Sequence, residues 1–166
     1  TIARHATPAL AAAAMVAMMM FSGHGFSPVS EAAISNHRLD LPTEISTSDL
    51  QKVAAWVRPK VDFAPRLPAL PTAQLEGARL AQIRDRPAAY LFYKVSGNRV
   101  SVFVFDPADL PIDGRRIRHV GGRDVYLDEK AGYHVALIRE NGLGYAFASD
   151  LDEDRMFQLV SSSMPR

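Results

Sequence analysis

Residues 90–105 decide the fold class, and they read YLFYKVSGNRVSVFVF. Tyr90–Val95 and Arg99–Phe105 are rich in aromatic and β-branched side chains, which favour strands. Ser96–Asn98 lie between them and are typical of a short hairpin turn. The stretch therefore predicts two antiparallel strands joined by a tight turn.

The same pattern recurs on both sides of this hairpin. Tyr133–Ile138 and Leu143–Ala148 flank Asn141-Gly142, a dipeptide suited to a type I′ turn because both central residues of that turn need a positive φ. Leu75–Arg84 and Arg123–Leu127 complete a set of about six strands. Because short turns join neighbours in the chain, the sequence predicts an antiparallel sheet.

One helix is predicted on each side of the strands. Ser48 or Asp49 is a good N-cap for a helix that ends around Arg58, before Pro59. Asp150 caps a final helix, with Glu153 three residues on as in a capping box. The predicted fold class is α+β, with a helix, a sheet of about six antiparallel strands and a C-terminal helix, both helices lying on one face.

The segment between the first helix and the strands is rich in proline. Three prolines at threefold spacing within Phe63–Pro71 favour an extended, polyproline-like strap that crosses onto the sheet. Trp56, the only tryptophan, lies on the apolar stripe of the first helix. We therefore expect Trp56 to anchor the core.

The N-terminal part differs in composition from the rest. Arg4 is the only charged residue before Glu31, and residues 9–21 are an unbroken apolar run. With residues 22–26 the segment just reaches the length of about 20 residues that a membrane-spanning helix needs. A secretory signal peptide is an alternative, with a small-x-small cleavage site at Ser30-Glu31-Ala32. A buried core helix is disfavoured because the segment is apolar all round.

These observations divide the chain into four predicted parts. They are a cytoplasmic stub at 1–7, a transmembrane helix at 8–26, a linker at 27–48 and an extracytoplasmic α+β domain at 49–166. The linker is predicted because serine, asparagine and proline interrupt any periodicity there. His37 is accordingly interpreted as a solvated linker residue.

Few residues suggest a chemical function. The chain has no cysteine, which excludes a disulfide scaffold and a thiolate nucleophile, and its formal net charge of +1 argues against a nucleic-acid binder. Asp150–Asp154 lacks the glycine of a calcium loop and is attributed to the dipole of the final helix. His119 and His134 have no evident third metal ligand, and the basic run Asp113–His119 is interpreted as a solvated loop. The sequence predicts no catalytic, cofactor-binding or metal site.

An ordered set of these elements carries a family resemblance. The set comprises the uncharged segment Pro8–Phe26, the helix Ser48–Arg58, the strands Tyr90–Val95 and Val100–Phe105 running into Asp106-Pro107, and the closing runs GYHVAL at 132–137 and GLGYAFASDL at 142–151. Together they resemble the transmembrane anti-sigma factor family of bacteria. The similarity is to the extracytoplasmic part of that family and covers most of residues 8–160.

The resemblance implies a single-pass inner-membrane regulator with its N-terminus in the cytoplasm and residues 27–166 in the periplasm. In that family a cytoplasmic head, often a histidine–cysteine zinc module, holds an extracytoplasmic-function sigma factor, and an outer domain senses envelope conditions. Proteolysis often releases the sigma factor. The expected partners of this sequence are the lipid bilayer at residues 8–26 and site proteases, with the sigma factor reached only through a head that this sequence lacks. The resemblance implies no enzyme, no cofactor and no direct nucleic-acid binding.

Two other functions are open on the sequence alone. A secreted or periplasmic small binding protein would arise if residues 1–32 were a cleaved signal peptide, and a set of strand tyrosines would then hold an apolar or sugar ligand. These tyrosines are Tyr90, Tyr93, Tyr126, Tyr133 and Tyr145. A small hydrolase is disfavoured because the sequence offers no nucleophile–base pair. For the anchored protein, protease access to the linker is the predicted signalling step, since loops with few buried backbone bonds open cheaply.

Overall fold

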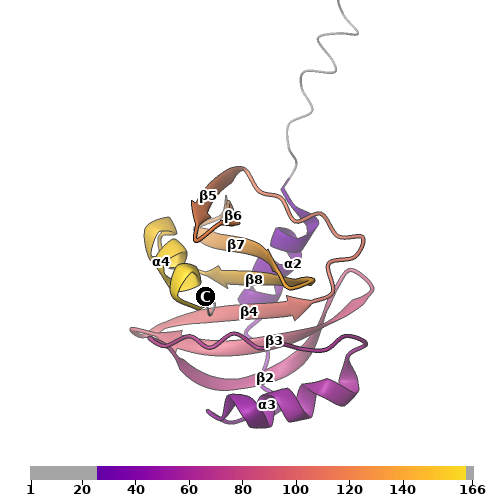
Figure 1. Ribbon diagram of the computed structural model, residues 1–166. Helices are drawn as coiled ribbons and strands as arrows, with labels where there is room; N and C mark the ends of the chain where they lie inside the picture. Colours follow the sequence, from indigo (N-terminus) through magenta and orange to yellow (C-terminus); the bar gives the residue numbers. More distant parts are fainter. Residues whose placement is uncertain (1–25, 164–166) are drawn as a thin grey trace, which may run out of the picture.

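The computed structural model describes residues 26–163. Eight strands form a single antiparallel sheet, and helices cover both of its faces (Figure 1). The elements are α2 (Pro28–Arg38), β1 (Ile45–Ser46), α3 (Leu50–Val57), a 3-10 turn (Arg58–Lys60), β2 (Gln74–Ile83), β3 (Arg86–Val95), β4 (Asn98–Phe105), β5 (Arg116–Val120), β6 (Arg123–Lys130), β7 (Tyr133–Glu140), β8 (Leu143–Ser149) and α4 (Glu153–Ser163).

The sheet consists of two meanders that meet in its centre. Its strand order is β1-β2-β3-β4-β8-β7-β6-β5, so β4 pairs with β8 and the later strands run outward in reverse order. At the junction Val102 lies opposite Phe147, and Phe103 lies opposite Ala146. The two regions that the sequence marks as hairpins therefore supply the four central strands.

The α+β class is confirmed, but the sheet has eight strands and not about six. The two missed strands are β1 and β5, which lie at the opposite edges of the sheet. β1 has only two residues, and β5 reads RIRHV, with exposed or half-buried positions throughout. Neither strand has the apolar alternation on which a strand prediction depends.

Each face of the sheet carries its own core. On one face α3 and α4 pack through Val53, Val57, Met156 and Leu159, together with the proline-rich strap. On the other face α2 packs through a stripe of small apolar side chains. The prediction that the two recognised helices share a face is confirmed, while the helix on the opposite face was not predicted.

Helix α2 corrects the prediction of a linker over residues 27–48. Ser27 caps it by accepting a hydrogen bond from the backbone N–H of Val29 (3.3 Å), and Pro28 occupies its first turn. Val29, Ala33 and Ile34 are buried against the sheet. The chain from 28 to 38 is therefore part of the folded domain.

The predicted membrane-spanning helix at 8–26 and the stub at 1–7 lie outside the described residues, apart from Phe26. None of the helices between Phe26 and Ser163 is long and apolar enough to cross a membrane.

On the face that carries α3 and α4, the structure shows how the proline-rich strap, Trp56 and the start of α4 differ from or add to what the sequence predicts. The strap is held down by two tyrosines, because Tyr93 donates to the carbonyl of Pro68 (2.7 Å) and Tyr145 donates to that of Arg66 (3.0 Å). Trp56 packs against this core but is only half-buried. Helix α4 begins later than predicted, since Asp152, and not Asp150, accepts from the backbone N–H of its first turn.

Candidate functional site

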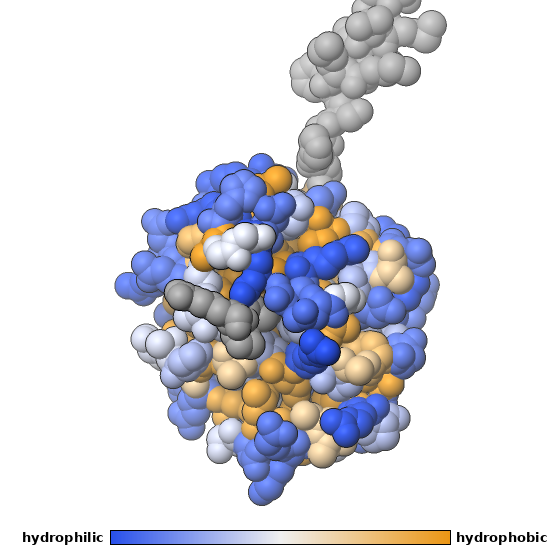
Figure 2. Space-filling model, in the orientation of Figure 1, coloured by the Kyte–Doolittle hydropathy of each residue, from blue (hydrophilic) through white to orange (hydrophobic). Residues whose placement is uncertain are grey.

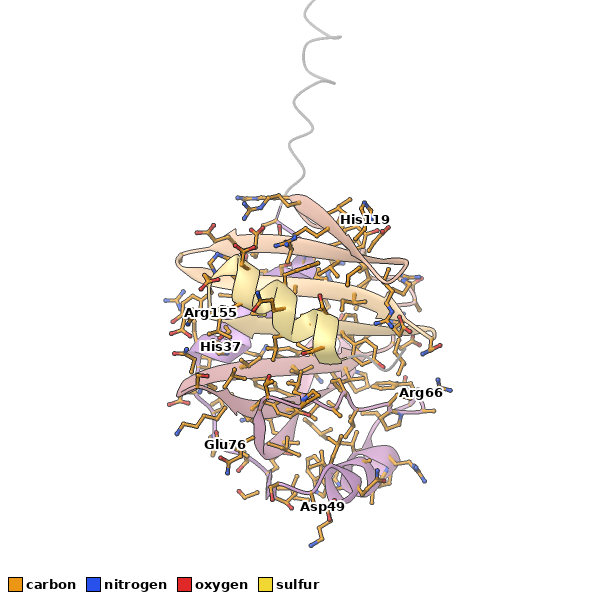
Figure 3. The ribbon with its side chains drawn as sticks, turned by 60° about the vertical axis from the view of Figure 1, so that its left-hand side comes forward. His37, Asp49, Arg66, Glu76, His119 and Arg155 are labelled. Carbon is orange, nitrogen blue, oxygen red and sulfur yellow. The ribbon has the colours of Figure 1, made fainter. Side chains whose placement is uncertain are left out.

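The most unusual cluster of polar side chains lies where the C-terminal end of α2 meets the sheet. A pocket of about 360 Å³ opens there, lined by His37, Arg38, Asp40, Arg99, Tyr133 and Asp150. Figure 3 marks His37 on α2, on the side of the sheet opposite α4. The pocket lies between α2, the strands β4 and β7, and the residue that follows β8.

His37 takes part in a buried chain of hydrogen bonds. Its Nδ1 lies 2.6 Å from the hydroxyl of Ser101, and that hydroxyl lies 2.7 Å from the phenol oxygen of Tyr90. His37 is only 5% exposed, and Ser101 and Tyr90 are fully buried. When Tyr90 donates to Ser101 and Ser101 donates to Nδ1, all three groups are satisfied around a neutral imidazole.

The sequence places these groups together through the period of two along the strands. Ser101, Phe103 and Phe105 alternate along β4, and both phenylalanines belong to the core beneath α2. Tyr90 lies opposite Phe103 on the neighbouring strand, and the two rings stack with centroids 4.3 Å apart. Ser101, at the end of this row of apolar side chains, therefore provides the hydroxyl to which His37 hydrogen-bonds.

The pKa of His37 is lowered from 6.5 to about 4, first by burial and then by the nearby Arg99 guanidinium, against smaller opposing effects of Asp150 and Asp40. The imidazole is therefore neutral at pH 7. Burial also raises the pKa of Tyr90, so its phenol stays protonated and can donate.

Arg99 closes the end of α2. Its guanidinium donates to the backbone carbonyl of His37 and to the carboxylate of Asp40. Asp40 has a φ of +46°, where the chain leaves the helix and turns. The ring of Tyr133 meets the ring of His37 edge-on, with centroids 5.5 Å apart. Arg99 thus holds an orphan carbonyl of the helix terminus and the turn that follows it.

A second polar contact holds the N-terminal half of α2. The hydroxyl of Ser30 donates to the carboxylate of Asp128 (2.6 Å), and the backbone N–H of Arg115 donates to the other carboxylate oxygen (3.0 Å). Asp128 is only 2% exposed. At the surface nearby, Lys130 pairs with Glu31 at 2.5 Å. Helix α2 is thus fixed at both ends by hydrogen bonds to the sheet.

The geometry does not favour catalysis at the Ser101–His37 pair. Ser101 is fully buried beneath α2, so its hydroxyl has no approach for a substrate from solvent. Across residues 26–163, no group of three side chains is placed to hold a metal ion. His119 bonds to Asp124 (2.6 Å), and His134 lies 3.7 Å from Glu129. The two histidines that the sequence analysis singled out therefore have separate surroundings.

The acidic residues of Asp150–Asp154 have structural roles at the start of α4. Glu153 and Asp154 lie in the first turn of α4, where carboxylates oppose the helix dipole. Glu153 pairs with Arg116, and Asp154 pairs with Arg118. This agrees with the interpretation of the run as compensation for the helix dipole.

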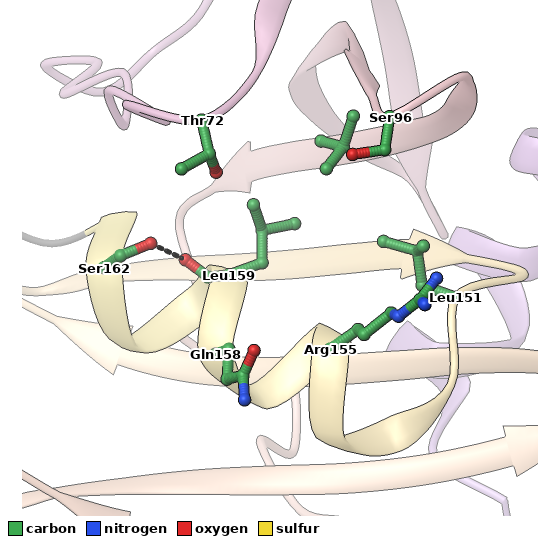
Figure 4. Close-up of a pocket in the computed structure, with 8 residues that line it drawn as sticks. Thr72, Ser96, Leu151, Arg155, Gln158, Leu159 and Ser162 are labelled. Carbon is green, nitrogen blue, oxygen red and sulfur yellow. Dashed lines mark hydrogen bonds between the residues drawn. The ribbon is translucent and has the colours of Figure 1, made fainter.

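A larger groove of about 460 Å³ lies beside α4 (Figure 4). Leu151, Leu159 and Val95 line it with apolar side chains, and Thr72, Ser96 and Arg155 line it with polar ones. Arg155 is already paired with Asp152. Ser162 is also engaged, because its hydroxyl donates to the carbonyl of Leu159 (2.8 Å). The groove therefore defines no ligand chemistry of its own.

The strand tyrosines do not form one ligand surface. Tyr93 and Tyr145 belong to the core under α3 and α4, and both hold the strap. Tyr90, Tyr126 and Tyr133 belong to the opposite face. The five tyrosines that the sequence analysis proposed as a ligand-binding set therefore lie on opposite faces of the sheet.

Sequence reasoning missed the site at α2 because it treated residues 27–48 as a linker. One signal was present, since Val29, Ala33, Ile34 and His37 recur at helical spacing. Comparisons with protein-family models, curated proteins and solved structures gave no match for this chain.

Proposed function

We propose that this chain is the anchor and outer sensory part of a membrane-bound anti-sigma factor, with the apolar segment that begins at residue 8 in the bilayer and the α+β domain, against which Phe26 packs, in the periplasm. Two features of the sequence support this proposal, the apolar run at residues 9–21 and the family resemblance. The observation that carries it is the docking of α2. The helix that directly follows the apolar run is built into the core of the domain.

A tethered sensor needs a physical link between its folded domain and its anchor. Only residues 22–27 separate the apolar run from α2, so a change in the docking of α2 acts directly on that short stretch. Held by Ser30 and His37, the helix keeps its backbone away from proteases. Release of α2 would expose the segment next to the membrane, which is a route to regulated cleavage.

The alternative of a cleaved signal peptide is disfavoured by the packing of α2. Cleavage after Ala32 would cut the helix in its middle. It would remove the fully buried Val29 and the hydrogen bond from Ser30 to the buried Asp128. A mature chain that began at Ala33 would therefore leave a buried carboxylate without its side-chain partner, which is costly.

The anchor is tested by fractionating bacteria that express the full chain with an epitope after Arg166. We expect the chain to stay with membranes in a carbonate wash, and the epitope to be digested when protease is added to spheroplasts. Ala14→Arg combined with Met18→Arg should abolish retention, because charged side chains are costly at the bilayer centre. Leu39→Arg, at an exposed position of the domain, is the matched control and should leave retention intact.

The regulatory part needs a separate measurement. Deleting the gene in its native bacterium should raise transcription from a discrete set of promoters that share one −35 and −10 pair. An unchanged transcript profile would contradict the anti-sigma role, even where the anchor is confirmed. Full-length chain in the cytosolic fraction, or a mature N-terminus at Ala33, would contradict the anchor itself.

A further inference from the structure

The anchor proposed above leaves very little chain between the membrane and the folded domain. A helix over residues 9–21 would span about 20 Å at 1.5 Å per residue, whereas the hydrocarbon layer of a bilayer is about 30 Å thick. The residues that follow this run are therefore needed to complete the crossing. Phe26, at the end of them, already packs against the core beneath α2. The surface of the domain around Phe26 therefore lies at the headgroup layer.

This surface belongs to one end of the molecule. Figure 1 shows the start of α2 at the same end as β5 and β6, with α3 at the opposite end. Two cations lie near the ring of Phe26, since the guanidinium carbon of Arg115 is 5.7 Å from its centroid and the Nζ atom of Lys130 is 5.2 Å from it. In Figure 2 the surface over β5 and β6 is mainly hydrophilic. Such a surface suits contact with polar headgroups and not with hydrocarbon.

Among the cations at this end, Arg115 differs in having an unpaired side chain. Lys130 pairs with Glu31 at 2.5 Å, and Arg116 and Arg118 pair with carboxylates of α4. Within the described part of the chain, no carboxylate pairs with the exposed guanidinium of Arg115. A guanidinium can donate two parallel hydrogen bonds to a phosphate. Because every phospholipid headgroup carries a phosphate, this contact requires no net charge on the membrane.

Arg115 is also linked to α2 through a buried carboxylate. Its backbone N–H and the hydroxyl of Ser30 donate to the two oxygens of Asp128, at 3.0 and 2.6 Å. A pocket of about 440 Å³ opens beside Arg115, lined also by residues of β5 and β6. A headgroup bound at the side chain of Arg115 therefore acts on the residue whose backbone shares Asp128 with α2.

We propose that the surface around Phe26 rests on the phospholipid headgroups and that the guanidinium of Arg115 binds a lipid phosphate there. The proposal rests on the anchor proposed above, and it adds a second contact between the domain and the membrane. This contact fixes the orientation of the domain. It also couples the headgroup layer to the docking of α2 through Asp128.

The test uses the full chain in nanodiscs of two lipids without net charge. Phosphatidylcholine carries a phosphate, whereas digalactosyldiacylglycerol carries none, and both form bilayers that can hold the apolar segment. The exchange of the Arg115 Nε–H with water, followed by NMR, should be at least fivefold slower in phosphatidylcholine. The Nε–H of Arg58, an exposed arginine directly after α3, is the matched control and should exchange equally in both lipids.

A second measurement places the surface relative to the membrane. A nitroxide on the headgroups of phosphatidylcholine nanodiscs should broaden the amide signal of Lys130 at least threefold more than that of Asp49, which Figure 3 labels at the opposite end of the molecule. Arg115→Gln should halve the broadening at Lys130, whereas Arg58→Gln should leave it unchanged. Because glutamine keeps the backbone N–H that donates to Asp128, the variant retains the contact with α2.

The outcomes separate this proposal from the anchor on which it rests. Equal exchange of the Arg115 Nε–H in both lipids, or stronger broadening at Asp49 than at Lys130, would overturn the headgroup contact while the anchor stood. Inorganic phosphate that slowed this exchange as strongly in the galactolipid nanodiscs would also overturn it, because the site would then bind a free anion. A chain that failed to enter nanodiscs of either lipid would contradict the anchor and this proposal together.

Discussion

The two faces of the sheet are covered by helices that are held in different ways. On the face of α3 and α4 the buried contacts are apolar, the ion pairs of α4 with Arg116 and Arg118 lie at the partly exposed rim, and the tyrosines bind the strap through backbone carbonyls. On the face of α2 the apolar contacts are joined by two buried polar links, Ser30 with Asp128 and His37 with Ser101. Apolar packing responds little to solution conditions near neutral pH, whereas a buried imidazole responds to protons.

This difference indicates which face can act as a switch. A helix whose buried contacts are all apolar separates from the sheet only when the domain unfolds, because its burial is shared with the whole core. A helix held in part by a neutral histidine can be weakened separately. Helix α2 is also the helix next to the apolar N-terminal run. The following variants test whether the two faces differ in this way.

The largest effect is expected at Phe147, a fully buried residue of β8 in the core under α3 and α4. Phe147→Ala should lower the free energy of unfolding by about 3–5 kcal/mol, because it removes a large apolar side chain and leaves a cavity. Urea denaturation of the full chain measures the loss. The half-buried Phe157 on α4 is the control, and Phe157→Ala should cost less than half as much. A loss confined to α4 would show that this face is not a single cooperative core.

The next effect is the pH dependence of α2. The pKa of His37 is about 4 in the folded chain and 6.5 for an ordinary histidine. Between these values the unfolded or undocked state binds more protons, so stability falls as the pH is lowered from 6.5 to 4. The expected loss over that range is about 3 kcal/mol. It should appear first as faster amide exchange in α2, with the exchange of α4 little changed.

Two histidine variants test this prediction, one at His37 itself and a control at His119. His37→Gln should remove most of the pH dependence, because the position no longer titrates. His119→Gln, on the exposed edge strand β5, should retain it. If α2 and α4 lose protection together as the pH falls, the faces do not open separately and His37 is not a local switch.

A smaller effect is expected at Gly144, in the centre of the sheet. Its φ is not positive, so it is not a turn glycine; a Cβ there would lie 2.5 Å from two ring atoms of Phe105. Because Phe105 is fully buried, Gly144→Ala should cost about 1–3 kcal/mol through overpacking. Phe105→Leu should partly rescue it in the double variant. If the losses of unfolding free energy of the two single variants simply add in the double variant, the Phe105 ring is not the reason that position 144 requires glycine.

The same contrast explains how far sequence reasoning reached. The central strands were predictable because each is a run of apolar, aromatic and β-branched residues bounded by turn residues, and α3 was predictable from its helical spacing of apolar residues. The buried side of α2 mixes apolar residues with Ser30 and His37, whose partners lie 98 and 64 residues away in the chain. β5 escaped notice because an edge strand with alternating arginines has no apolar face. Polar groups whose partners are distant in sequence leave no local pattern.

The smallest effect tests the polar contacts of the apolar face. Tyr93 is nearly buried, and its hydroxyl donates to the carbonyl of Pro68 in the strap. Tyr93→Phe should cost about 1 kcal/mol, because one hydrogen bond is lost and a carbonyl is left without this donor. The loss should be independent of pH from 4 to 8, since burial raises the pKa of Tyr93 well above that range. Tyr145→Phe, which frees the carbonyl of Arg66, is the matched variant and should behave alike. If either variant made the stability of the α4 face vary with pH between 4 and 6.5, proton sensitivity would not be confined to the face of α2.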